Sequence, residues 1–211
     1  MTKPGVQVHP IEEESYRILA ERIDLSAWPP GPRAVVARVV HATADPHLAS
    51  TLVVPDDAVE AGVQAIRSRA TVICDVEMLR AAIRGAPWLD ARCYLGKVAS
   101  PAPPRSTRSA AAMELAAREH PRGAVIAVGC APTALAAAVH LIRSGELTPA
   151  LVVGVPVGFV GAAESKEDLR RVSEETEIPV ISNVGERGGA AFAAAVVNAL
   201  LRLATEDAGG E

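Results

Sequence analysis

The residue best suited to acid–base chemistry in this sequence is His41. It follows an apolar run over residues 34–40, interrupted only by Arg38, that is typical of a buried strand. A histidine at the carboxyl end of a strand would lie at the edge where open α/β sheets bind ligands, with a pKa close to neutrality. The residues alone leave two interpretations open: a histidine that donates a proton, or a core histidine that bonds a backbone carbonyl.

A hydroxyl group stands on the apolar face of the first expected helix. Ser15 lies four residues from both Ile11 and Leu19. Such a serine either bonds back to the preceding turn or points its hydroxyl into a site. The sequence does not decide between these roles, nor whether Asp45 and His47 reach the same place.

Hydroxyl and guanidinium groups gather at the start of an alanine-rich helix. The group consists of Arg105, Ser106, Thr107, Arg108 and Ser109. Hydroxyl caps, free backbone amides and guanidinium forks together would form a receptor for carboxylate or phosphate. Ordinary helix capping with solvated arginines is the alternative.

Glycines follow several of the apolar runs. Residues 151–155 indicate a strand covered on both faces, and Gly158 and Gly161 then shape the turn into a helix. Residues 129–138 and 187–197 likewise lead from glycine into an alanine-rich helix. Free amides at several strand ends on one edge could bind a multiply anionic ligand.

Composition and missing motifs exclude several classes of function. The formal charge is -4 without any basic run, so a nucleic-acid partner would find no electrostatic footprint. There is no GxGxxG or Walker motif for a nucleotide and no GxSxG elbow of a hydrolase. Cys74, Cys93 and Cys130 lack metal-binding spacing and indicate free thiols in a reducing compartment. With no signal peptide or membrane span in the sequence, we expect a cytoplasmic protein without a membrane partner.

Short apolar runs alternate with helical patterns, and 49% of the residues are hydrophobic. This alternation predicts one α/β domain over residues 1–211, a three-layer α/β/α sandwich with a mainly parallel sheet. Residues 100–105 are a linker candidate and residues 205–211 are expected to be a frayed tail. Besides residues 34–40, strands are expected at residues 72–74, 93–95, 124–128, 151–155 and 179–181. Helices are expected at residues 11–23, 56–69, 76–84, 107–120, 133–144, 162–175 and 189–203.

Several of these motifs resemble the precorrin-8X methylmutase family of cobalamin biosynthesis, including its cobalt-precorrin-8 relatives. The most distinctive run, PVGFVGAAESK at residues 156–166, matches without a break. The resemblance covers residues 11–203. The other matching stretches follow in the family's order and spacing: TRSAAAMEL (107–115), APTAL (131–135), CDVEM (74–78), RGG (187–189) and His41.

The resemblance implies a flavodoxin-like sheet, a homodimer, and an isomerase that moves a methyl group from C-11 to C-12 of the macrocycle by a 1,5-sigmatropic shift. The product would be hydrogenobyrinate from precorrin-8X, or cobyrinate from cobalt-precorrin-8, and would pass to neighbouring pathway enzymes. No cofactor or protein-bound metal is implied, since any cobalt belongs to the substrate. His41 would be the general acid. The implied pocket lining is Ser15, Thr107, Arg108, Ser109, Gly158, Gly161, Lys166, Arg187, Gly188 and Gly189.

The sequence departs from the family pattern at Thr43, Ala44, Cys130, Glu186 and Ala190. The family commonly has glycine at the position of Ala44, and its loss would change how the turn after the histidine approaches the ring. Cys130 stands where asparagine is usual. These departures leave a second hypothesis open, a corrinoid carrier that binds without turnover. A third hypothesis, a flavodoxin-like regulatory or nucleotide-binding module, would instead bind FMN or a nucleotide.

Overall fold

The sheet is mixed, with a single antiparallel strand at one edge. The computed structural model describes residues 9–84, 88–100 and 106–206, so most of the expected linker and tail lies outside the described residues. Within them, six strands form one sheet in the order β1-β6-β5-β4-β2-β3, and only β1 runs antiparallel to its neighbour. The strands are β1 (Leu52–Val53), β2 (Val72–Cys74), β3 (Ala91–Cys93), β4 (Val125–Val128), β5 (Leu151–Gly154) and β6 (Val180–Asn183).

The parallel strands follow the order of flavodoxin. Counted along the chain from β2, they are arranged 2-1-3-4-5 from β3 to β6. The order reverses between β2 and β4, and ligands of doubly wound sheets bind at such a switch point. The α/β fold class predicted from the sequence is confirmed.

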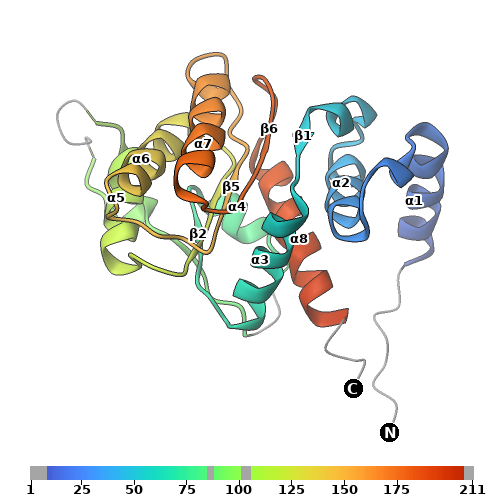
Figure 1. The fold of residues 1–211 in the computed structure, drawn as a ribbon, viewed down its shortest axis with the longest axis horizontal. Coiled ribbons are helices and arrows are strands. Elements are labelled where there is room, and N and C mark those ends of the chain that lie inside the picture. Colours follow the sequence, from blue (N-terminus) through green and yellow to red (C-terminus); the bar gives the residue numbers. More distant parts are fainter. Residues whose placement is uncertain (1–8, 85–87, 101–105, 207–211) are drawn as a thin grey trace, which may run out of the picture.

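Helices cover both faces of the sheet (Figure 1). They are α1 (Pro10–Arg22), α2 (Pro30–Thr43), α3 (Asp56–Arg67), α4 (Glu77–Ala82), α5 (Arg108–Glu119), α6 (Pro132–Arg143), α7 (Ala162–Thr176) and α8 (Ala190–Glu206). The group α5, α6 and α7 packs on one face with Ile126 and Val152, and the group α3, α4 and α8 packs on the other with Ala127 and Val153. Helix α2 packs on α8, and α1 packs on α2, so these two extend the second helical layer outward.

The prediction of a strand at residues 34–40 is wrong, because residues 34–40 lie within helix α2. Val35 and Val39 belong to the core beneath α8, whereas Val36 and Val40 belong to a small core shared with α1. A helix buried on two sides has a continuous apolar run, which is also the pattern of a buried strand. His41 therefore lies in the last turn of a helix outside the sheet.

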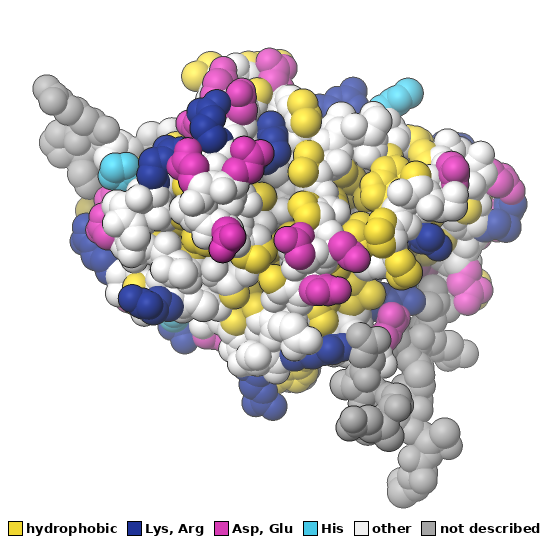
Figure 2. Space-filling model, in the orientation of Figure 1, with side chains coloured by type: hydrophobic (Ala, Val, Ile, Leu, Met, Phe, Trp, Pro, Cys, Tyr) yellow, Lys and Arg dark blue, Asp and Glu magenta, His cyan; other side chains and the backbone are white. Residues whose placement is uncertain are grey.

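The other expected strands and helices are present, with shifted ends. Strand β1 was not expected, because two residues are too few to produce an alternating pattern. It pairs with the end of β6 and joins the segment after α2 to the sheet. Within the described part of the chain, none of the helices could serve as a membrane span. On the face drawn in Figure 2, acidic and basic side chains are interspersed.

Helix α2 ends at a residue in the left-handed conformation. Ala44 has φ 53° and ψ 26°, which costs a residue other than glycine about 1–2 kcal/mol. The hydroxyl of Thr43 donates to the Val39 carbonyl at 2.8 Å and closes the last turn. Glycine, which the resemblance leads us to expect at this position, is the residue that the conformation favours.

We expect Ala44→Gly to raise the free energy of unfolding by about 1 kcal/mol, because glycine adopts this conformation without steric cost. Urea denaturation would measure the change. Ala42→Gly, in the last turn of the same helix, should lower the same quantity by about 0.5–1 kcal/mol. Two glycine variants of equal, lowered stability would contradict the assignment.

Candidate functional site

His41 makes contacts on two sides of its imidazole ring. The Ser15 hydroxyl oxygen lies 2.8 Å from Nδ1, and the Tyr16 ring stacks on the imidazole with centroids 4.9 Å apart and planes inclined by 15°. Both contacts run from α1 to α2 and hold the orientation of the ring. Because the hydroxyl occupies Nδ1, Nε2 is the nitrogen left to exchange a proton with a ligand.

The surroundings of His41 favour the neutral imidazole. Burial lowers the pKa of His41, the positive charges of Arg38 and Arg84 lower it further, and Glu12 opposes them. Arg38 is itself held by Glu12, with 2.6 Å between Nη1 and Oε1. An anionic ligand close to the ring would shift the balance towards the protonated form.

Two cavities lie around the stacked rings. Ser15 and His41 line one of about 110 Å³, and Tyr16 lines a second of about 630 Å³ between α1, α2 and α8, together with Arg38 and Arg84. Pockets for drug-sized ligands measure about 300–1,000 Å³, so the first cavity admits only a small group. A large ligand would reach His41 with its edge.

At the far end of the sheet's carboxyl edge, the predicted anion receptor is largely engaged in local contacts. The Thr107 hydroxyl caps α5 and lies 2.8 Å from the hydroxyl of Thr133, which belongs to α6. Arg108 is exposed and donates to the Leu95 carbonyl at 3.1 Å. Ser109 is half-buried, and Arg105 lies outside the described residues.

The loop between β5 and α7 exposes apolar side chains at this edge. Phe159 is 91% exposed and Val160 87%. Gly158 and Gly161 have φ values of 152° and 77°, and both lie beside Pro132 at the start of α6. Their conformations turn the loop outward, so the edge offers an apolar surface next to its polar groups.

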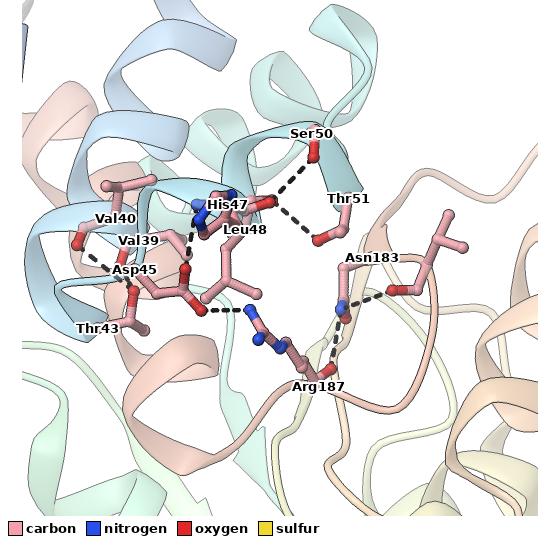
Figure 3. A network of polar contacts seen from close by, with 11 residues as sticks. Val39, Val40, Thr43, Asp45, His47, Leu48, Ser50, Thr51, Asn183 and Arg187 are labelled. Atoms are coloured by element: carbon pink, nitrogen blue, oxygen red, sulfur yellow. Dashed lines mark hydrogen bonds and ion pairs between the residues drawn. The ribbon is translucent and has the colours of Figure 1, made fainter. Parts of the chain in front are cut away.

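The RGG turn, residues 187–189, connects this edge to the end of α2 (Figure 3). The Arg187 guanidinium forms an ion pair with Asp45, two residues after the end of α2. A Cβ atom at Gly188 would come within 2.1 Å of the Val155 carbonyl oxygen, so only glycine fits there. The next amide of the turn donates to the same oxygen at 3.0 Å.

Lys166 lies inside the protein. Its side chain has no exposed surface, and Nζ donates to the Arg187 carbonyl at 2.8 Å and to Oδ1 of Asn183 at 3.2 Å. Burial lowers the pKa of Lys166 to about 8. In this arrangement the ammonium group supports the RGG turn from behind.

The switch point of the sheet holds an anion of the protein's own. Asp75 follows β2, is 4% exposed, and accepts backbone N–H groups of Gly129, Cys130 and Ala131 at 3.1, 2.8 and 2.8 Å. Burial raises the pKa of Asp75, and these three bonds oppose the shift. The expectation of free amides after β4 is therefore wrong, because a carboxylate occupies the place where related sheets bind phosphate.

The structure joins some of the predicted residues and leaves others apart. Ser15 and His41 form a bonded pair. Lys166, predicted to line the pocket, has no exposed surface and lies behind the edge. The remaining candidates follow one another along the sheet edge, and their contact with a ligand stays a prediction. Sequence reasoning missed Tyr16 and Asp75. An acid directly after a buried strand was a usable signal for Asp75, whereas the stacking of Tyr16 depends on how α1 crosses α2.

The chain is similar to known methylmutases over nearly its whole length. The family model for precorrin-8X methylmutase matches residues 10–203. A cobalt-precorrin-8 methylmutase of Methanothermobacter thermautotrophicus is 40% identical over 205 residues, which are 95% of each chain. A precorrin-8X methylmutase of Pseudomonas aeruginosa is 36% identical over 90% of this chain and 93% of its own. The crystal structure of a precorrin-8X methyl mutase from Thermus thermophilus superposes with a TM-score of 0.76 and 35% identity, covering 95% of this chain and all of that one.

We expect Asp75→Asn to lower the free energy of unfolding by about 3 kcal/mol, because an amide cannot accept all three N–H groups with charged oxygens. Urea denaturation would measure the loss. Asp168→Asn is the matched control: this carboxylate is 49% exposed and pairs with Arg171, so its loss should cost about 0–1 kcal/mol. Equal losses in the two variants would show that Asp75 does not hold the turn.

Proposed function

Because the chain belongs to the precorrin-8X methylmutase family, and is an isomerase of cobalamin biosynthesis, we propose that it moves a methyl group from C-11 to C-12 of the corrin precursor. The product is hydrogenobyrinate from precorrin-8X or cobyrinate from cobalt-precorrin-8. The observation that supports the mechanism is the Ser15–His41 pair, because a hydroxyl bonded to Nδ1 leaves Nε2 to donate the proton.

His41 acts as the general acid. Protonation of the ring-nitrogen side of the migrating system draws electron density out of the conjugated macrocycle and eases the 1,5-sigmatropic shift. Ser15 keeps the Nδ1 side bonded in either state of the ring, because a hydroxyl can both donate and accept. Tyr16 holds the ring plane and stabilises the imidazolium form through its π face.

Substrate binding favours the protonated form of His41. His41 has a lowered pKa in the free protein because of burial and the charges of Arg38 and Arg84. The substrate carries several carboxylates, and their negative charge raises the pKa of a nearby imidazole. Binding therefore prepares the acid, and the same arginines can balance the substrate's acidic groups.

The macrocycle lies across the carboxyl edge of the sheet, since the cavity beside His41 measures only about 110 Å³. Phe159 and Val160 offer apolar contact for its face. Arg108 and Arg187 are exposed along the same edge and suit its carboxylates. The protein works as a homodimer, in which a second copy encloses the ligand from the open side.

The reaction needs no cofactor of the protein's own. A methyl shift within one molecule exchanges no electrons with another reactant and adds no atoms. Cobalt, where present, is part of the substrate. We place the reaction in the cytoplasm, with the product handed to the next enzymes of the pathway.

His41→Ala should lower kcat by about 10²–10⁴-fold, the range that general acid catalysis contributes, while leaving the dissociation constant for hydrogenobyrinate nearly unchanged. The shift is followed by the change in absorption spectrum, with precorrin-8X and cobalt-precorrin-8 tested separately. His140→Ala is the control, since His140 is exposed on α6. Parent-rate turnover by His41→Ala would refute the acid assignment, and a wild-type protein that binds hydrogenobyrinate but converts neither substrate would be a carrier.

The pH dependence of kcat/KM should report the free histidine. Because only protonated His41 can donate, kcat/KM should fall as the pH rises through a pKa that burial and Arg38 hold below the usual value. Arg38→Gln removes a positive charge and should move this fall to higher pH. A flat wild-type profile between pH 5 and 8, or a shift of the variant to lower pH, would contradict the assignment.

A further inference from the structure

Burying a lysine side chain completely costs more free energy than burying an apolar side chain in its place. Lys166 lies in the second turn of α7 without exposed surface. Its hydrogen-bond acceptors are an amide oxygen and a carbonyl oxygen, so no carboxylate neutralises the ammonium directly. Unpaired buried charge is costly, which indicates a specific use for the donors on Nζ.

Those donors meet at one atom, the carbonyl oxygen of Arg187. Nζ of Lys166 and Nδ2 of Asn183 each lie 2.8 Å from it. Asn183 is itself fully buried at the end of β6, and its Oδ1 accepts from Nζ. The three groups form a closed triangle that determines where the backbone of Arg187 lies.

The side chain of Arg187 extends from this fixed backbone towards α2. Figure 3 shows the guanidinium directed at Asp45, whose carboxylate also caps the 3₁₀ turn that begins at Pro46 by accepting the His47 amide at 3.1 Å. Asp45 follows the left-handed Ala44 that ends α2. The ion pair is mostly exposed on the arginine side, so by itself it is worth about 0–1 kcal/mol. Its geometry therefore depends on how firmly the backbone behind it is held.

We propose that Lys166 is a positioning residue for the methyl shift: through the Arg187 carbonyl and the Arg187–Asp45 ion pair, it holds the end of α2 that carries His41 against the edge of the sheet. The inference rests on the proposed role of His41 as the acid. In this proposal Asp45 and Arg187 are parts of the same support for the end of α2. A displacement of about 1 Å at a reacting group can cost on the order of 10²-fold in rate.

The charged groups around Lys166 agree with a role inside the protein. Arg170 lies on the next turn of α7 and donates to the Asn183 carbonyl at 3.2 Å. Its charge adds to the effect of burial in lowering the pKa of Lys166, and Glu186 partly opposes both. The ammonium thus lies among groups that bind the ends of β6 and of the RGG turn, and none of them faces the cavity beside His41.

A double-mutant cycle tests the proposal, with Lys166→Met, Asp45→Asn and the double variant in the full-length protein. We expect each single variant to lower kcat about tenfold with little change in KM, and the double variant also about tenfold, because both remove the same support. A loss in the double variant equal to the product of the single losses would overturn the proposal. Lys97→Met, at an exposed lysine paired with Glu119, is the matched control and should keep the parent kcat.

A second variant and an NMR measurement separate the role of Lys166 from a folding defect and from a failure of the proposed function. Lys166→Gln retains a donor without charge and takes the place of Lys166→Met in the cycle if the latter does not fold. The pKa of His41, followed by NMR of labelled histidine, should shift in the Lys166 and Asp45 variants and stay unchanged in the Lys97 variant. Wild-type protein without turnover would refute the proposed function, whereas an unshifted His41 with additive losses in kcat would refute only the role of Lys166.

Discussion

The carboxylate of Asp75 is the contact on which the carboxyl edge of this sheet depends. It binds three backbone amides where the strand order reverses, a place at which doubly wound proteins commonly bind phosphate. Further along the edge, the Val155 and Arg187 carbonyls are likewise satisfied from within. These backbone groups of the edge thus serve the fold, which leaves side chains and exposed apolar surface for the recognition that we propose.

His41, the acid of the proposed mechanism, comes from outside the sheet. With the switch point occupied, His41 is supplied by α2, which packs on α8, and is oriented by α1, which packs on α2. Ser15 and Tyr16 fix the two ring contacts across that helix pair. The segment after α2 returns to the sheet through β1 and through the Arg187–Asp45 ion pair. The histidine is therefore tied to the sheet edge through the segment that follows α2.

Three of the departures from the family pattern, Ala44, Cys130 and Glu186, lie at a helix end or in loops that follow strands. Ala44 adopts the conformation in which glycine is favoured, and Cys130 contributes its amide, not its side chain, to the bond with Asp75. The Glu186 carbonyl accepts the Gly158 amide at 3.1 Å and joins the two loops after β5 and β6. The hydrogen bonds that join Cys130 to Asp75 and Glu186 to Gly158 use the backbone, which any residue other than proline supplies. These two hydrogen bonds therefore do not depend on the substituted side chains.

The sequence by itself determined the class of fold and the family, because alternating apolar runs and an unbroken PVGFVGAAESK motif depend only on neighbouring residues. It misjudged α2, because a helix buried on two faces and a buried strand share one pattern. Tertiary structure alone decided that Tyr16 stacks on His41, that Lys166 turns inward, and that the amides at residues 129–131 are already bound. Each of these depends on which elements pack together, and burial and charge pairing across such contacts leave no periodic trace along the chain.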